Sequence, residues 1–108
     1  MPRREPQSEL PRLSRKERLI LDLLATEGDS YGLQLVDASQ GQLKRGTVYV
    51  TLGRMEAKEL VESFAEEPER ARSGTPRRIY RPTARGRRAL HAVEVAEALW
   101  AGAEGEAS

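Results

Sequence analysis

Closely spaced helix starts and stops constrain the first half of this chain more than any other feature. Ser14-Arg15-Lys16-Glu17 fits a capping box, in which the Ser14 hydroxyl and the Glu17 carboxylate each accept a hydrogen bond from the other residue's backbone N–H. An apolar stripe follows, and Gly28 is placed to end the helix with a positive φ. The stripe consists of Leu19, Ile20, Leu23 and Leu24. We therefore predict a first helix that begins after Ser14 and ends at Gly28.

Two more helix starts follow within about twenty residues. Asp29-Ser30 offers an N-cap for a second helix over 31–40, which Gly41 would close. Its inward residues would be Tyr31, Leu35 and Val36. Thr47 is a plausible N-cap for a third helix, with its hydroxyl accepting from the backbone N–H two or three residues on. The third helix would bury Val48, Leu52 and Met55, which recur at helical spacing. Such a pair of short helices joined by a tight turn indicates a helix-turn-helix.

The pattern then changes to that of strands. Residues 60–65 and 78–82 alternate in a strand-like way, and a charged, turn-rich segment separates them. Pro82 cannot donate to a ladder, so the second strand should be an edge strand or end there. Three helices followed by two strands around a basic loop predict a winged helix. The fold class expected is α+β and mostly α, with the winged helix-turn-helix domain over 14–83.

A further helix is predicted from Ala84 to about Ala101, capped by Thr83. Its apolar stripe must pack either on the chain's own core or against a second subunit. The stripe contains Ala89, Leu90, Val93, Ala96, Leu99 and Trp100. Residues 1–13, with three prolines and no periodicity, are expected to form a flexible arm, and 102–108 a frayed tail.

Charge is distributed unevenly along the chain. The net charge is +1, but the segment from Arg70 to Arg88 holds eight arginines and no acid, which leaves −7 on the remainder. Such segregation is typical of a cationic surface for a polyanion. The alternative is a solvated arginine-rich loop, although a loop that only confers solubility would mix the two signs.

Several classes of function are excluded by composition. The chain has no cysteine and one histidine, His91, so disulfides, thiolate zinc sites and Cys/His catalysis are ruled out. There is no glycine-rich phosphate cradle, and no nucleophile–base pair can be named. We therefore expect neither an enzyme nor a metal or other cofactor. No apolar run is long enough for a membrane span, and we expect a cytoplasmic protein.

Two sequence blocks resemble the PadR family of transcriptional regulators. The first is Ser30-Tyr31-Gly32 followed by Gly46-Thr47-Val48-Tyr49, Leu52, Arg54-Met55-Glu56 and Leu60-Val61. The second runs from Gly74 to Gly86, and the resemblance covers about residues 17–93. It implies a winged helix-turn-helix that dimerises through its carboxy-terminal helix and binds a palindromic operator, usually as a repressor. Three positions depart from the family pattern, namely Val50, Gly53 and Glu59, where the family often has proline, a larger polar residue and glycine.

The expected DNA-binding residues lie in two groups. The first is on and before the third helix, where cations would meet phosphates or a guanine edge in the major groove. It comprises Lys44, Arg45, Thr47, Tyr49, Thr51 and Arg54. The second is the wing, whose arginines would contact the DNA backbone or the minor groove. It comprises Arg70, Arg72, Arg77 and Arg78. Tyr49 has an alternative role as a half-buried ring packed against the second helix.

Trp100 is the only tryptophan of the chain. Resemblance to multidrug-sensing relatives implies that it could line a site for a small hydrophobic effector, whereas the simpler interpretation is that it fills the dimer seam. Two other functions stay open at this point. One is a winged-helix docking module for another protein, and the other is an RNA-binding winged helix, for which exposed aromatic residues are scarce.

Overall fold

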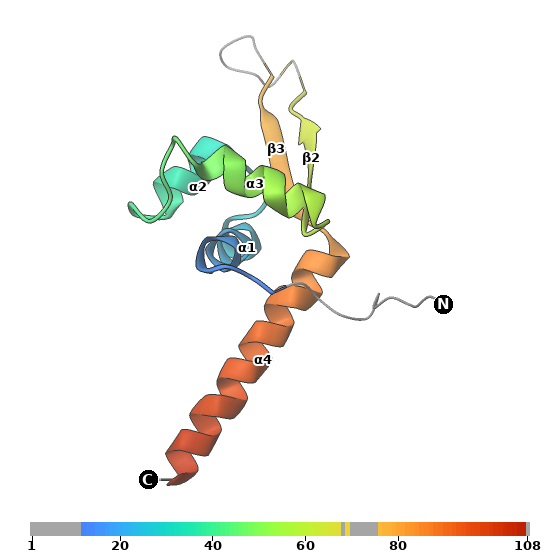
Figure 1. Cartoon of the computed structure of the whole chain (residues 1–108). Helices are drawn as coiled ribbons and strands as arrows, with labels where there is room; N and C mark the ends of the chain where they lie inside the picture. Colours follow the sequence, from blue (N-terminus) through green and yellow to red (C-terminus); the bar gives the residue numbers. More distant parts are fainter. Residues whose placement is uncertain (1–11, 68, 70–75, 108) are drawn as a thin grey trace, which may run out of the picture.

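The computed structural model describes residues 12–67, 69 and 76–107. These residues form four helices and a small antiparallel sheet with strand order β1-β3-β2 (Figure 1). The elements in chain order are α1 (Arg15–Glu27), β1 (Ser30–Tyr31), α2 (Gly32–Ala38), α3 (Val48–Ala57), β2 (Val61–Ala65), β3 (Arg78–Pro82) and α4 (Ala84–Ala107). The predicted class, a mostly helical α+β winged helix, is confirmed.

The start of α1 is the predicted capping box. The backbone N–H of Ser14 donates to Glu17 Oε1 at 2.9 Å, and the N–H of Glu17 donates to Ser14 Oγ at 3.1 Å. Gly28 ends the helix with φ +88°. The expected flexible arm falls mostly outside the described residues, but its last residue, Leu13, packs against the core.

The second helix begins later and ends earlier than the sequence predicts. Ser30 and Tyr31 pair with Tyr80 and Ile79 of β3 as the strand β1, and Tyr31, where the sequence predicts the first helical residue, is the N-cap of α2. The Ser30 hydroxyl donates to the carbonyl of Gly28 at 2.8 Å and caps nothing. The sequence does not predict β1, because two residues are too few to show the alternating pattern of a strand.

This short strand also changes the place of β3 in the sheet. Because β1 pairs with one side of β3 and β2 with the other, β3 is the central strand, and the expectation of an edge strand is wrong. Pro82 is tolerated because it is the last residue of β3 and lies opposite Val61, beyond the two residues that β1 pairs. The alternative expectation, that the strand ends at Pro82, is confirmed.

The core lies between α1, α3, the sheet and the first turns of α4. The inward residues predicted for the third helix are all buried. Ala89 and Leu90 of α4 are buried in this same core, at 2% and 8% exposure. The chain's own α1 and sheet cover these two residues, so this part of the predicted stripe packs on the chain's own core, the first of the two alternatives.

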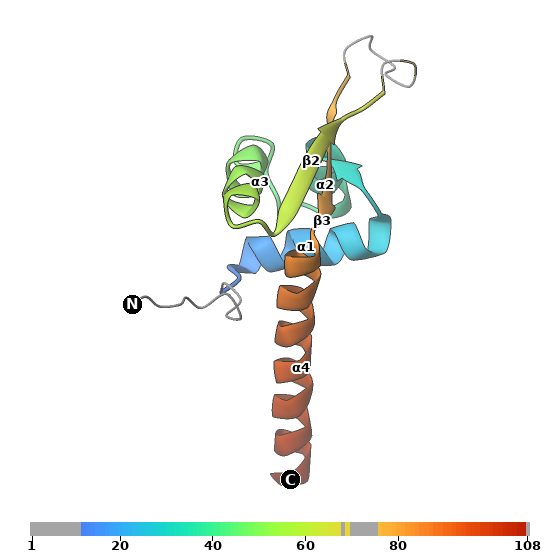
Figure 2. The same cartoon turned by 90° about the vertical axis from the view of Figure 1, so that its right-hand side faces the viewer.

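Beyond Leu90, α4 leaves the domain and extends away from the β2–β3 hairpin (Figures 1 and 2). It runs to Ala107, so residues 102–107 are helical where the sequence predicts a frayed tail. Alanine and glutamate, both good helix formers, outweigh the two glycines of that segment. Arg18 of α1 forms an ion pair with Glu97 of α4, and it also pairs with Asp22. No helix in the described ranges combines the length and apolarity that a membrane crossing requires.

The turn between α3 and β2 has a backbone conformation that favours glycine at position 59, where this chain has glutamate. Glu59 has φ +61°, a conformation that glycine adopts without strain. Its carbonyl accepts from the Thr83 hydroxyl at 2.6 Å, and the N–H of the next residue, Leu60, donates to the carbonyl of Met55 at 2.8 Å. This turn therefore ties the end of α3 to the start of α4.

Candidate DNA-binding surface

Helix α3 presents one side to solvent over its whole length. Opposite its buried side, Tyr49 is 48% exposed and Val50 is 54% exposed, and Gly53 and Arg54 are exposed one turn further on. Thr47 is the N-cap as predicted, but its side chain accepts no capping hydrogen bond, since its φ of −125° and ψ of −10° depart from the usual cap geometry.

Two other predicted DNA contacts are engaged within the protein. The Tyr49 ring lies against α2, so closely that a Cβ at Gly32 would be 2.5 Å from Tyr49 Cζ. Packing of Tyr49 against the second helix is thereby confirmed, while its contact to a phosphate stays a prediction. The Thr51 hydroxyl points back along the helix and donates to the carbonyl of Thr47 at 3.4 Å.

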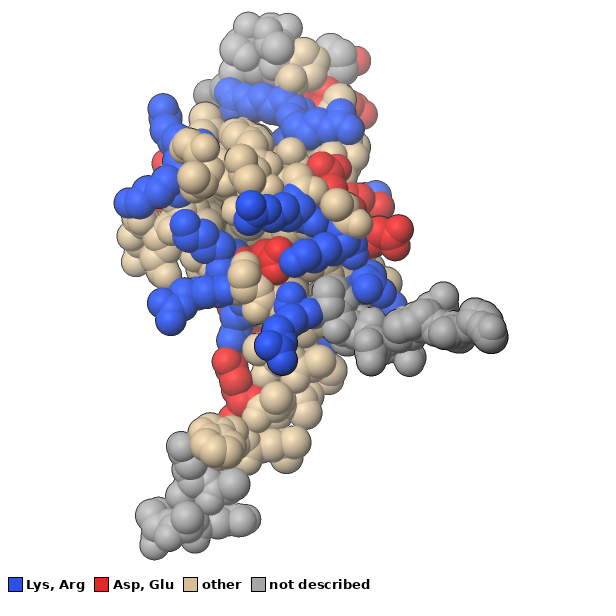
Figure 3. All heavy atoms as spheres, in the orientation of Figure 1, with Lys and Arg blue, Asp and Glu red and all other residues tan. Residues whose placement is uncertain are grey.

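Three predicted DNA-binding cations lie in the turn before α3 and on its solvent side. Lys44, Arg45 and Arg54 are exposed, and within the described part of the chain none of them forms an ion pair. By contrast, Lys58 and Arg81 pair with Glu17 and Glu62. In Figure 3, lysine and arginine side chains gather over the face that carries α3, whereas acidic side chains gather beside β2. The cations of this face are thus available for an external anion.

Lys58, the C-cap residue of α3, has a structural partner 41 residues away in the sequence. Its Nζ lies 2.7 Å from Oε2 of Glu17, whose side chain is only 4% exposed. Burial raises the pKa of the Glu17 carboxyl, but hydrogen bonds from Lys58 and Ser14 and the charge of Lys58 outweigh it and hold that pKa below 4.5. The pair joins α1 to the end of α3.

Replacing Lys58 with methionine should lower the free energy of unfolding near pH 7 by about 1–3 kcal/mol, because the buried carboxylate loses its cation. Since the pKa of Glu17 is below 4.5 in the folded protein, the native pair stabilises fully above about that pH and is lost as the pH falls further. Urea unfolding from about pH 7 to pH 3 should therefore show the two proteins converging in acid. The exposed Lys16→Met variant is the control, and a difference that stays constant with pH would contradict the assignment.

The two described arginines of the wing, Arg77 and Arg78, do not form one surface. Arg78 Nε donates to Ser63 Oγ at 3.0 Å, and the Ser63 hydroxyl donates to the carboxylate of Glu56 in α3 at 2.7 Å. The guanidinium of Arg77 instead lies 4.3 Å from the centre of the Tyr31 ring. Arg70 and Arg72 lie outside the described residues. Arg81, Arg85 and Arg87, which belong to the same basic segment, bind Glu62 or backbone carbonyls. The +8 segment is therefore divided between the wing and the start of α4.

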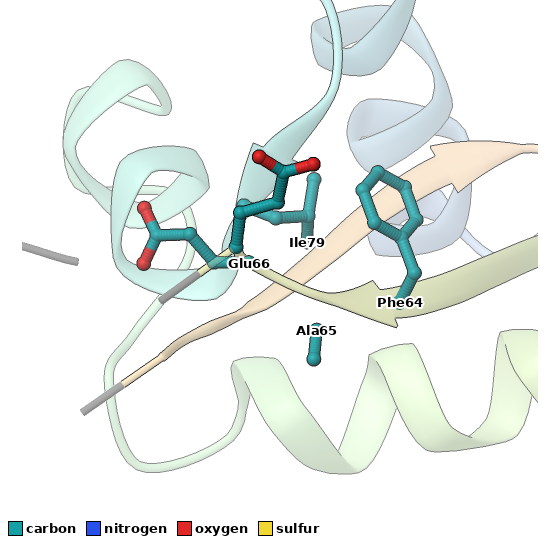
Figure 4. A pocket seen from close by; sticks show the side chains of 5 residues that line it. Phe64, Ala65, Glu66 and Ile79 are labelled. Atoms are coloured by element: carbon teal, nitrogen blue, oxygen red, sulfur yellow. The ribbon is translucent and has the colours of Figure 1, made fainter. Parts of the chain in front are cut away.

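The outward face of the hairpin carries a hollow of about 480 Å³ (Figure 4). Phe64 and Ile79, which pair across β2 and β3, line it together with Ala65, Glu66 and Glu67. Two carboxylates beside an apolar floor repel phosphate, so this hollow is not suited to the DNA backbone.

Comparisons with known proteins agree with this geometry. The transcriptional regulator PadR-like family matches residues 20–92. The chain is similar to a PadR family transcription regulator from hypervirulent Clostridium difficile R20291, with 29% identity, a TM-score of 0.65 and coverage of 85% of this chain and 93% of that one. It is similar to a PadR family regulator from Eggerthella lenta DSM 2243, with 29% identity, a TM-score of 0.65 and coverage of 84% and 79%.

A MarR family transcription regulator, SP03579, has 26% identity and a TM-score of 0.71, with coverage of 89% of this chain and 59% of that one. No curated protein matches the chain. The family match spans well over half of the 108 residues and includes α3, the sheet and the buried part of α4. The chain therefore belongs to the PadR-like family of transcriptional regulators, which are DNA-binding proteins and not enzymes.

Proposed function

We propose that this protein binds double-stranded DNA as a homodimer at a palindromic operator and represses transcription. One observation carries the proposal: Lys44, Arg45 and Arg54, in the turn before α3 and on its solvent side, are exposed and have no acidic partner in the described chain, whereas Lys58 and Arg81 are paired with Glu17 and Glu62. Unpaired cations around a solvent-facing helix are the arrangement that binds phosphates and guanine edges.

In this proposal α3 enters the major groove. Lys44 and Arg45, in the turn before the helix, contact phosphates and set its register, and Arg54 contacts a phosphate or a guanine. Arg78, held against α3 through Ser63 and Glu56, contacts the backbone beside the groove. Arg77 on the other side of the sheet, together with Arg70 and Arg72, contacts the backbone or the minor groove from the wing.

The homodimer is proposed to form through α4. In the part of α4 that follows Leu90, Val95, Leu99 and Trp100 are 42%, 70% and 68% exposed. On a single chain these residues form an apolar stripe that is exposed to water. A second copy related by a twofold axis would cover the stripe and place two α3 helices against a palindrome. Val93, half-buried, and Ala96 border the same stripe.

The Trp100 ring would also give the seam an aromatic surface for a small hydrophobic effector. Because Trp100 is the only tryptophan, quenching of its fluorescence reports such binding directly. As a regulator of transcription, the protein would act in the cytoplasm, where bacterial DNA lies.

The test compares two single-charge variants for binding to the duplex upstream of the protein's own gene. Fluorescence anisotropy at two salt concentrations, with a scrambled duplex alongside, should show Arg54→Ala weakening operator binding at least about tenfold. Arg81→Ala removes the same charge from a residue paired with Glu62 and should change the affinity little. If Arg54 contacts a phosphate, its variant also lowers the salt slope by about one; if it reads a base, the preference over the scrambled duplex falls instead.

Equal losses in Arg54→Ala and Arg81→Ala would contradict the assignment of α3 as the DNA-reading element. Absence of binding to either duplex at low salt would overturn the DNA-binding function and favour the docking module. Salt-sensitive binding without preference would leave only a nonspecific role.

A further inference from the structure

We propose that Val50 recognises the C5-methyl group of a thymine, so that each operator half-site holds an A·T pair facing the first turns of α3. The inference rests on the proposed function and deepens it, because it names a base that the protein reads and the residue that reads it.

Val50 lies on the side of α3 that the proposed function places in the major groove. It is 54% exposed on the solvent side of α3, whose opposite side is filled by the buried Val48, Leu52 and Met55. Arg54 follows four residues later, so that the two side chains lie one above the other on this side. An apolar side chain next to an unpaired arginine has one apolar complement in the major groove, the thymine methyl group.

The neighbours of Val50 leave it the room to reach a base. Gly53, nearly one turn further on, has no side chain, and a Cβ built there would meet no heavy atom within 4 Å. The helix backbone can therefore approach the floor of the groove closely at this point. Ala57, one turn beyond Gly53, also has a small side chain, so no long side chain at these two positions keeps the backbone away from the groove.

The polar groups near Val50 are held away from its contact. The Tyr49 ring is packed over Gly32 of α2, and the Thr51 hydroxyl is bonded to the carbonyl of Thr47. Both groups are therefore engaged within the chain, and the exposed side chain of Val50 is the apolar contact that this turn of α3 offers. Val50 and Arg54 are thus neighbouring exposed side chains, one apolar and one cationic, on the solvent side of α3.

The experiment uses the full chain and the duplex that it enriches from a random pool. Each thymine of that duplex is replaced in turn by uracil, which keeps base pairing and removes only the methyl group. For the wild type, one uracil per half-site should weaken binding about fourfold, the loss expected for one buried methyl. Val50→Ala should bind the thymine duplex about fourfold more weakly and should lose less affinity than the wild type when uracil replaces that thymine.

Leu33→Ala is the matched control, since it removes an exposed apolar side chain, 36% exposed, from α2. It should retain both the wild-type affinity and the full response to uracil. Specific binding with no uracil effect, or an equal uracil effect in Val50→Ala, overturns this inference alone. Failure of the wild type to enrich any duplex overturns both the inference and the proposed function.

Discussion

Replacing Gly86 with alanine should lower the free energy of unfolding by about 3 kcal/mol or more, which is large for the addition of one methyl group. A Cβ at Gly86 would lie 2.0 Å from the carbonyl oxygen of Leu60 and 3.3 Å from Cδ2 of Leu21. The backbone of Leu60 cannot yield easily, because its N–H donates to Met55 and its carbonyl accepts from the N–H of Thr83. The clash therefore forces α4 away from the core.

The matched control for Gly86 lies in the same helix. Gly102 is exposed, and a Cβ there would meet no atom within 4 Å. Gly102→Ala should raise stability by up to about 1 kcal/mol, because alanine has the higher helix propensity. Urea unfolding of both variants measures the contrast, and similar small changes in both would show that the root of α4 is not tightly packed.

The second large effect is expected where α4 carries its exposed apolar stripe. The double variant Leu99→Glu/Trp100→Glu should convert the dimer to a monomer and weaken operator binding about a hundredfold, because two linked half-site contacts become separate events. The fold of the winged helix should survive, since both side chains are more than two-thirds exposed on the single chain. Sedimentation gives the mass, circular dichroism the folded state, and anisotropy the affinity.

Ala101→Glu supplies the control for this pair. Ala101 is also exposed, and helical periodicity places it on the side of α4 opposite Leu99. The control should stay dimeric and bind the operator as the wild type does. A double variant that remains a dimer would show that the two chains meet elsewhere, and a wild type that is monomeric at micromolar concentration would contradict the proposed homodimer itself.

The elements that follow from local signals were predictable from the sequence. The capping box of Ser14 and Glu17, the buried side of α3 and the bounds of β3 depend on residues close together in the chain. The strand β1 was missed because its two residues are extended only through pairing with β3, about fifty residues away. Contacts of this kind leave no periodic pattern.

The candidate site shows the same division. Periodicity identified the exposed side of α3, but it did not separate Ala89 and Leu90, which the core covers, from Leu99, which it does not. The point at which a helix leaves its domain depends on the size of the rest of the domain. Likewise, the partners that distinguish Lys58 from Arg54 become visible only when α1 and α3 are brought together.

The close packing of Gly86 against the backbone of Leu60 has a consequence for regulation. In the proposed dimer, α4 would be a continuous helix about 36 Å long, as expected for 24 residues. Thr83, which precedes α4, is hydrogen-bonded to Glu59 in the turn that ends α3. A change in the crossing angle of the two α4 helices would then change the separation of the two α3 helices. Operator half-sites lie about 34 Å apart. A tilt of a few degrees between the two α4 helices would therefore move the two α3 helices away from this spacing.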